Sequence, residues 1–273
     1  MASPPSILSL LLHFVITATV SSADSSGAMV RMYPRKHVVR AEGDPRCESW
    51  KFAVEVNAAG PWKSVPRPCI GFVREYFNGG RYLSDSKVVV KYSLTFANSV
   101  NVAVKDSGRD AWVFDVDETL LSNLPYYKVN GYGSKPYNDT SFNEWVNKGL
   151  APPLPMSLRL YKKLQNLGFK IFLLTGRGES QRNITEENLL KAGYSGWEKL
   201  ILRGDADEGK KATVYKSEKT AELVKEGYII QGSFGDQWSD LMGFPLANRS
   251  FKLPNPINHK GKLGLPLSFT AYL

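Results

Sequence analysis

Cysteine and histidine are both scarce in this chain, which has two cysteines and three histidines among its 273 residues. Neither the spacing of the cysteines nor a nearby histidine suggests a zinc site, because structural zinc needs a set of such ligands close together. Internal repeats and low-complexity segments are absent, and beyond the amino terminus no apolar run is long enough to cross a bilayer. The composition is otherwise that of a globular protein, with 42% hydrophobic and 22% charged residues.

Long runs of one charge are also missing, although the formal net charge is +9. Such an excess suits a nucleic acid, an anionic surface or phosphorylated substrates. Because the lysines and arginines are spread along the chain, we expect no nucleic acid among its partners.

The amino terminus has the features of a secretory signal. Ile7–Val20 is almost wholly apolar, no Lys, Arg, Asp or Glu precedes Asp24, and Ser21-Ser22-Ala23 offers small residues for cleavage. The apolar run is shorter than a comfortable membrane span. We therefore expect residues 1–23 to be a signal peptide, and no stable association with membranes once it is removed.

Cys47 and Cys69 are expected to form a disulfide, because the secretory pathway is oxidising. Two buried free thiols are the alternative. The chain also has candidate glycosylation triplets of the type Asn-x-Ser/Thr, which arise by chance as well. Their asparagines are Asn138, Asn183 and Asn248.

A helical segment is expected over residues 24–107. Residues 24–45 look extended and irregular, and residues 48–104 have the pattern of three helical pieces. The third piece is expected to begin at Asp85, although Val88-Val89-Val90 makes a strand a competitor there.

From residue 111 onward, apolar runs typical of strands alternate with helical patterns. Strands are expected at 111–116, 170–174, within 197–202 and at 228–231. Helices are expected at about 141–148, 156–166, 179–192 and from Lys216 to Gly227. Alternating strands and helices predict a parallel sheet with right-handed crossovers.

Asp115 and Asp117 directly follow the apolar run of the first of these strands. The carboxyl end of a buried parallel strand is where open α/β sheets place their ligand sites. Two carboxylates this close repel each other unless a proton or a cation lies between them, and Mg²⁺ is the favoured cation. An acidic turn after a strand is an equal alternative on this run alone.

Polar residues near the later strands suit the same chemistry. Thr175, followed by Gly176, puts a hydroxyl and backbone N–H groups within reach of a phosphate oxygen. Asp236 and Asp240 suit a cation site with one direct and one supporting ligand. Lys216 is expected to begin a helix and to neutralise a carboxylate and a bound phosphate. Taken singly, these residues are equally typical of a turn, a helix N-terminus and a solvated surface lysine.

Taken in order, the residues read Asp-x-Asp-x-Thr, Thr-Gly-Arg, Lys and Gly-Asp-x-x-x-Asp, and they resemble the four motifs of haloacid dehalogenase-type phosphohydrolases. The chain is further similar to plant class B acid phosphatases and vegetative storage proteins over about residues 45–256. The similarity is carried by Ala111–Tyr127, Leu174–Arg177, Tyr215–Lys219, Gly235–Gly243, Cys47–Trp50 and Val65–Cys69.

The resemblance implies a three-layer, Rossmann-like α/β core with a parallel sheet over residues 108–258. It also implies a small cap over the active site at about 122–155. Residues 259–273 match nothing in the family and form an unmatched tail. From the signal and the resemblance together, we expect the protein to enter the secretory pathway and to be extracellular or vacuolar.

The resemblance also implies a role for each motif residue. Asp115 would be the nucleophile that forms an aspartyl-phosphate, and Asp117 would protonate the leaving alcohol and then deprotonate water. Asp236 would complete the Mg²⁺ site with Asp115 and the backbone carbonyl of Asp117, supported by Asp240. The residues expected to hold the phosphoryl oxygens are Thr175 and Lys216.

The expected function is therefore Mg²⁺-dependent hydrolysis of small phosphate monoesters. A storage or defence protein with little phosphatase activity is the main alternative, although Asp115, the residue that some storage relatives have lost, is present. A basic binding module is the third alternative. The sequence is also compatible with a homodimer. The candidate substrate-facing aromatic residues, which packing would explain equally well, are Tyr126, Tyr127, Tyr137 and Trp145.

Overall fold

The computed structural model describes residues 43–59, 64–103 and 108–257. The expected signal peptide at 1–23 and the tail at 259–273 lie outside these residues. Within the described part of the chain, no helix has the length and hydropathy needed to span a membrane.

A parallel sheet of five strands forms the centre of the protein, in the order β3-β2-β1-β4-β5. The strands are β1 (Asp110–Phe114), β2 (Lys170–Gly178), β3 (Lys199–Arg203), β4 (Ile229–Gly235) and β5 (Arg249–Lys252). The central strand β1 is buried over its last four residues, as its apolar sequence predicts for a strand covered on both faces. The predicted α/β class and parallel sheet are confirmed.

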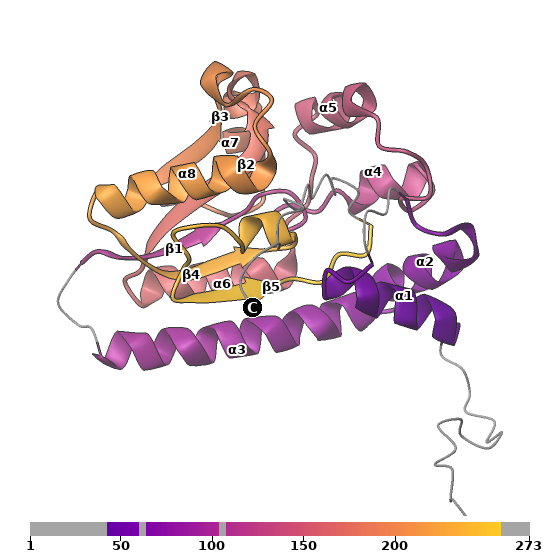
Figure 1. Ribbon diagram of the computed structural model, residues 1–273, viewed down its shortest axis with the longest axis horizontal. Helices are drawn as coiled ribbons and strands as arrows, with labels where there is room; N and C mark the ends of the chain where they lie inside the picture. Colours follow the sequence, from indigo (N-terminus) through magenta and orange to yellow (C-terminus); the bar gives the residue numbers. More distant parts are fainter. Residues whose placement is uncertain (1–42, 60–63, 104–107, 258–273) are drawn as a thin grey trace, which may run out of the picture. The chain divides into compact units, whose positions relative to one another are not determined.

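Helices cover both faces of this sheet and give three layers (Figure 1). On one face, Trp112 and Phe114 pack in a cluster with residues of α3, α6 and α7. On the other face, Ala111 and Val113 pack with Tyr215 and other residues of α8. The helices are α3 (Arg81–Ala103), α6 (Pro155–Asn166), α7 (Arg182–Lys191) and α8 (Ala212–Lys225).

The described residues before β1 are largely helical. They form α1 (Pro45–Glu55), the 3-10 turn η1 (Arg67–Cys69), α2 (Ile70–Asn78) and α3. Cys47 and Cys69 are joined in a disulfide with their Cα atoms 5.4 Å apart, so the alternative of free thiols is wrong. The Val88-Val89-Val90 triplet is helical and lies inside α3, which begins four residues before the predicted Asp85.

Several predicted boundaries were wrong. Lys216 does not begin α8, which starts at Ala212, close behind Gly209 with its positive φ of +72°. The helix predicted over 179–192 begins as the 3-10 turn η2 (Glu179–Gln181) before α7. The strand β2 continues to Gly178, with a break in its pairing with β3 after Leu174, so Thr175 lies inside its irregular end.

Two short helices lie between β1 and α6, and Figure 1 shows them beyond the end of the sheet toward which β1 points. They are α4 (Leu124–Val129), which the sequence did not predict, and α5 (Asp139–Asn147). Asn138 caps α5, because its side chain accepts a hydrogen bond from the Ser141 N–H at 2.9 Å. Asn138, Asn183 and Asn248, the glycosylation candidates, are all exposed.

Candidate active site

A tight turn after β1 places the first pair of carboxylates. The Asp115 N–H donates to the Phe234 carbonyl of β4 at 3.1 Å, so Asp115 is held between the two central strands. Leu120 and Leu121 both donate to the Val116 carbonyl at 2.9 Å, which folds the chain back at once. Glu118 adopts a positive φ of 55° within this turn. Asp115 is thereby fixed as a buried carboxylate at the carboxyl end of β1.

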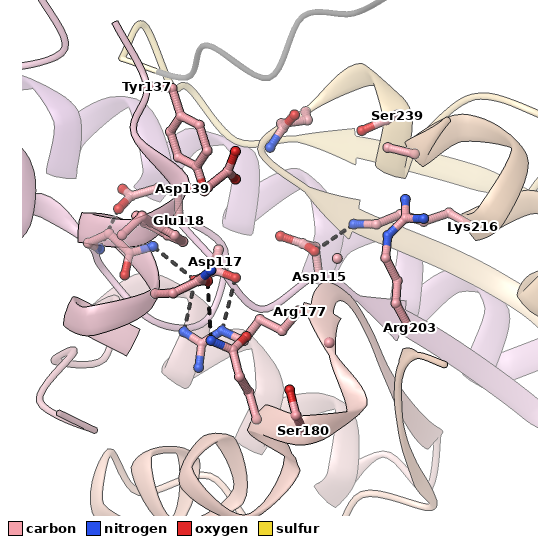
Figure 2. A pocket seen from close by; sticks show the side chains of 18 of the residues that line it. Asp115, Asp117, Glu118, Tyr137, Asp139, Arg177, Ser180, Arg203, Lys216 and Ser239 are labelled. Carbon is pink, nitrogen blue, oxygen red and sulfur yellow. Dashed lines mark hydrogen bonds and ion pairs between the residues drawn. The ribbon is translucent and has the colours of Figure 1, made fainter. Parts of the chain in front are cut away.

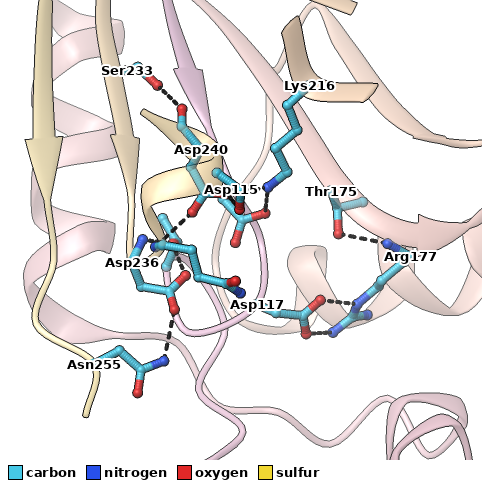
Figure 3. A network of polar contacts seen from close by, with 12 residues as sticks. Asp115, Asp117, Thr175, Arg177, Lys216, Ser233, Asp236, Asp240 and Asn255 are labelled. Carbon is cyan, nitrogen blue, oxygen red and sulfur yellow. Dashed lines mark hydrogen bonds and ion pairs between the residues drawn. The ribbon is translucent and has the colours of Figure 1, made fainter. Parts of the chain in front are cut away.

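Lys216 from α8 lies between two aspartates from different strands. Its Nζ donates to Asp115 Oδ1 and to Asp240 Oδ1, each at 2.6 Å (Figure 3). All three side chains are less than 10% exposed. Lys216 of α8 therefore links the carboxylates that follow β1 and β4, two neighbouring strands whose carboxyl ends share one edge of the sheet.

The charges of this cluster shift its proton affinities. Burial raises the pKa of Asp115 well above its ordinary value, although Lys216 opposes the shift. Burial alone would lower the pKa of Lys216, but the charges of Asp115 and Asp240 outweigh burial and raise it. Lys216 is therefore a permanent cation at the site.

Asp236 is oriented by two side chains remote in sequence. Its Oδ1 accepts from Thr119 Oγ1 at 3.1 Å, and its Oδ2 accepts from Asn255 Nδ2 at 2.7 Å (Figure 3). One carboxylate oxygen from each of Asp115, Asp236 and Asp240 lies within 4.8 Å of the others. Three converging carboxylates, each of them oriented by hydrogen bonds, fit a divalent cation that prefers oxygen ligands.

Asp117 lies apart from this carboxylate cluster and is paired with Arg177. Arg177 donates from Nη2 to Asp117 Oδ1 at 2.8 Å and from Nε to Oδ2 at 3.0 Å, which is a bidentate ion pair. Asn123 Nδ2 also donates to Asp117 Oδ1 at 2.9 Å. Trp145 in turn donates to Asn123 Oδ1 at 2.8 Å, so this aromatic supports the Asp117 side chain.

Thr175 is fully buried beside the same arginine. Its Oγ1 accepts from the Arg177 N–H at 3.2 Å, and the cavity wall at this point is made by Gly176 and Arg177. The structure thus brings Asp115, Lys216, Asp236 and Asp240 together, while Thr175 and Asp117 lie on the Arg177 side (Figure 3).

A cavity of about 810 Å³ opens onto both groups of residues (Figure 2). Asp115 and Asp117 line it from the turn after β1, Lys216 lines it from α8, and Tyr127 and Tyr137 line it from the segment between β1 and β2. Tyr126 instead packs against Tyr127 and Phe142 in a buried cluster. The cavity volume falls in the range of small-molecule sites.

The sequence did not identify four side chains that contact or support this site. Asn123 and Asn255 are single polar residues in loops, and no spacing rule marks them. Arg177 belongs to the Thr-Gly-Arg motif, which could have suggested a role for it. Arg203 ends β3 and lines the cavity, so its place at a strand end was the available signal.

Comparisons with known proteins agree with this geometry. A family model described as HAD superfamily, subfamily IIIB (Acid phosphatase) matches residues 35–260. Acid phosphatase 1 of Solanum lycopersicum is 46% identical over 250 residues, which cover 92% of this chain and 96% of that protein. Vegetative storage protein 1 of Arabidopsis thaliana is 35% identical and covers 92% of this chain and 97% of its own length.

The fold is shared with a solved structure described as class C acid phosphatase from Bacillus anthracis with tungstate bound. The two have a TM-score of 0.58 and 23% sequence identity, covering 69% of this chain and 84% of the other. From the family match and the similarity along most of the chain, we conclude that this protein belongs to the acid phosphatases of subfamily IIIB of the HAD (haloacid dehalogenase) superfamily.

Proposed function

We propose that the protein hydrolyses small phosphate monoesters with Mg²⁺, by way of an aspartyl-phosphate on Asp115. The observation that carries this proposal is the buried Asp115 carboxylate, which faces the cavity and contacts Lys216 at 2.6 Å. A carboxylate attacks an anionic phosphate only where nearby positive charge offsets the repulsion.

Each step has a residue of this chain to perform it. An oxygen of Asp115 bonds to phosphorus as the ester P–O bond breaks, and Asp117 gives a proton to the leaving alcohol. Asp117 then takes a proton from water, whose oxygen replaces Asp115 on phosphorus and releases phosphate. Lys216 compensates the negative charge of the phosphoryl oxygens throughout, and Thr175 is the proposed second phosphoryl contact.

Asp115, Asp236 and Asp240 would hold Mg²⁺, with the backbone carbonyl of Asp117 as a further ligand. When bound, the ion supplies positive charge that neutralises the phosphoryl oxygens. The hydrogen bonds of Asp236 to Thr119 and Asn255 support this assignment, because they fix the direction of one ligand.

Asp117 has to hold a proton in order to act as an acid, whereas its ion pair with Arg177 favours the ionised form. An anionic phosphoryl group entering the cavity offers Arg177 a second partner. Substrate binding would therefore weaken the pair and let Asp117 take up a proton.

We further propose that residues 122–155 form a small cap over this site. Support comes from Asn123, Tyr127, Tyr137 and Phe142, which all lie in this segment and line the cavity. Residues 24–107 would be a helical amino-terminal segment, residues 108–258 the catalytic core and residues 259–273 an extra tail.

A storage role is the second candidate, because relatives named vegetative storage protein are 34–35% identical to this chain. These relatives and the stem glycoproteins of Glycine max also favour a secreted or vacuolar location for this protein. The presence of Asp115 favours catalysis over storage alone.

Purified protein assayed with an aryl phosphate, with and without Mg²⁺, tests the proposal. We expect Asp115→Asn to lower turnover by about 1,000-fold or more, because no other residue replaces the nucleophile. The exposed Asp205→Asn is the matched control and should keep full activity. Equal turnover by Asp115→Asn and Asp205→Asn would exclude the covalent mechanism. If the unaltered protein showed no turnover either with or without Mg²⁺, a storage role would be favoured. We also expect an acidic pH optimum, because a phosphate monoester carries one fewer negative charge there and repels the Asp115 carboxylate less. A pH–rate profile peaking well above neutrality would contradict this expectation.

A further inference from the structure

Arg203 is a cavity residue that the proposed mechanism does not use. It is the last residue of β3 and lines the cavity together with Asp115 and Lys216 (Figure 2). In the sheet order, β3 lies two strands from β1. Adjacent strands are about 4.8 Å apart, so the backbone of Arg203 is offset from that of Asp115 by roughly 10 Å.

The Arg203 guanidinium is held in place on one side. Its Nη1 donates to the Asp207 carbonyl at 2.9 Å and to the Lys210 carbonyl at 3.1 Å. Its Cζ lies 4.3 Å from the centroid of the Tyr215 ring, a cation–π contact with a fully buried aromatic. These contacts restrict the side chain and keep it beside the 204–210 loop.

The remaining donors of Arg203 have no acceptor. Within residues 43–59, 64–103 and 108–257, no group accepts a hydrogen bond from its Nε or Nη2, and no carboxylate forms an ion pair with it. A guanidinium fixed on one edge, with its other edge open beside a cavity, is suited to bind a carboxylate or a phosphate.

The other two cations of the cavity wall differ in this respect. Arg177 forms a bidentate pair with Asp117, and Lys216 contacts both Asp115 and Asp240. Among the described residues that line the cavity, Arg203 is therefore the cation without a carboxylate partner. An anion in the cavity has no protein carboxylate to displace at this position.

We infer that Arg203 forms a second anion subsite. It favours substrates whose leaving alcohol carries another anionic group, a carboxylate or a phosphate. The inference rests on the proposed phosphatase function. The offset of two strands places this subsite away from the phosphoryl position at Asp115. A monoester with a neutral leaving group would leave it empty.

Three matched substrates test this subsite: phenyl phosphate, 4-carboxyphenyl phosphate and benzene-1,4-bisphosphate. We expect Arg203→Gln to raise KM about tenfold for either or both of the substrates with a second anion, the size of one lost charge-assisted hydrogen bond. The KM for phenyl phosphate and all kcat values should stay within about twofold. The two anionic substrates distinguish a carboxylate from a phosphate as the preferred second group.

Arg159→Gln is the matched control, since Arg159 is exposed on α6 and the substitution removes the same charge. It should leave all three KM values unchanged. Arg203→Lys should restore part of the selectivity, and it replaces the Gln variant if thermal unfolding shows that the latter does not fold. An equal rise in KM for all three substrates, or no rise for any, would overturn the inference.

Calorimetry separates this test from that of the proposed function. Benzene-1,4-bisphosphonate and phenylphosphonate bind without turnover, and we expect Arg203→Gln to weaken the first about tenfold relative to the second. Inactivity of the unaltered protein would count against the phosphatase mechanism. Equal affinities of the two phosphonates for the unaltered protein would count against the subsite.

Discussion

Lys216 balances the charge of the two buried carboxylates that it contacts. Replacing it with methionine leaves Asp115 and Asp240 buried beside each other without a cation. We expect Lys216→Met to lower the free energy of unfolding of the metal-free protein by about 3–5 kcal/mol at neutral pH. Urea unfolding measures this change, and Lys225→Met, an exposed position on the same helix, should stay within about 0.5 kcal/mol. If Lys216→Met lowered the free energy of unfolding by less than about 1 kcal/mol, Lys216 would not be needed to balance the buried carboxylates of Asp115 and Asp240.

The buried carboxylates also predict how stability depends on pH. Burial raises the pKa of Asp115 above its ordinary value of 3.8, and burial together with the charge of Asp236 raises that of Glu118 above 4.5. The folded protein therefore holds protons that the unfolded chain has released, so the free energy of unfolding falls as pH rises above these values. Lys216 has a raised pKa, and its contribution is constant below its ordinary value of 10.5.

We therefore expect the protein in EDTA to be more stable at about pH 5 than at about pH 7. Asp207, whose pKa Lys210 lowers, changes its contribution only below 3.8 and does not affect this window. Mg²⁺ requires ionised ligands, so its stabilising effect should increase over the same range. Thermal unfolding at both pH values, with EDTA and with Mg²⁺, measures both trends. Glu118→Gln should flatten the slope in EDTA, and a stability in EDTA that rises with pH would refute the prediction.

At the scale of single residues, the motif positions were predictable from the sequence, and their partners were not. Asp115, Lys216 and Asp240 meet because the carboxyl ends of parallel strands share one edge of the sheet. The pair between Asp117 and Arg177 depends on where each side chain turns after its strand. Side-chain direction in such irregular segments has no sequence period from which to predict it.

Gly235 shows how closely one short element is fitted to the end of β4. A Cβ at this position would lie 2.4 Å from Asp240 Cβ and 2.5 Å from its Oδ2, inside the 3-10 turn η4 (Trp238–Asp240). We expect Gly235→Ala to displace Asp240 from Lys216, with a loss of about 1–3 kcal/mol in unfolding free energy and a weaker stabilisation by Mg²⁺. Urea unfolding and a Mg²⁺ titration of Tm measure both effects.

The control for this substitution is Gly71→Ala in α2, where nothing lies within 4 Å of the added Cβ. Alanine is favoured over glycine in a helix by about 1 kcal/mol, so this variant should be as stable as the unaltered protein or more so. If Gly235→Ala matched it in both stability and Mg²⁺ response, the tight fit of η4 would be disproved.

Elements with a clear hydrophobic pattern were predictable, and elements without one, such as β5, were not. Val88-Val89-Val90 favours a strand locally, yet it lies in a helix of 23 residues whose apolar positions keep helical spacing. The strand β5 is four residues long with charged residues at both ends, Arg249 and Lys252, so it carries no strand signal of its own. It forms because pairing with β4 satisfies its backbone.

At the scale of the whole protein, α3 belongs to the same core as the sheet, and α1 is joined to the end of the sheet by polar contacts. Val90 and Ala97 of α3 are buried in the cluster that contains Trp112 and Phe251. Glu55 at the end of α1 accepts from Trp238 Nε1 through its backbone carbonyl at 3.0 Å. Its Oε2 pairs with Lys252 at 2.9 Å, so α1 contacts both η4 and β5. The amino-terminal helices therefore support the strands and turns that hold Asp236 and Asp240.

This arrangement predicts that the expected catalytic core does not fold without those helices. A fragment of residues 108–273 would expose Trp112, which is fully buried in the whole chain, together with much of one sheet face. Burying one large apolar side chain contributes about 1.5–3 kcal/mol, and a whole domain is stable by only about 5–15 kcal/mol. We expect this fragment to show no cooperative thermal transition and no near-ultraviolet circular dichroism. A fragment of residues 41–273 keeps every described helix and strand and should unfold cooperatively with the Tm of the full chain. Cooperative unfolding of the shorter fragment would mean that the core is an independent domain and that the amino-terminal helices are accessory to it.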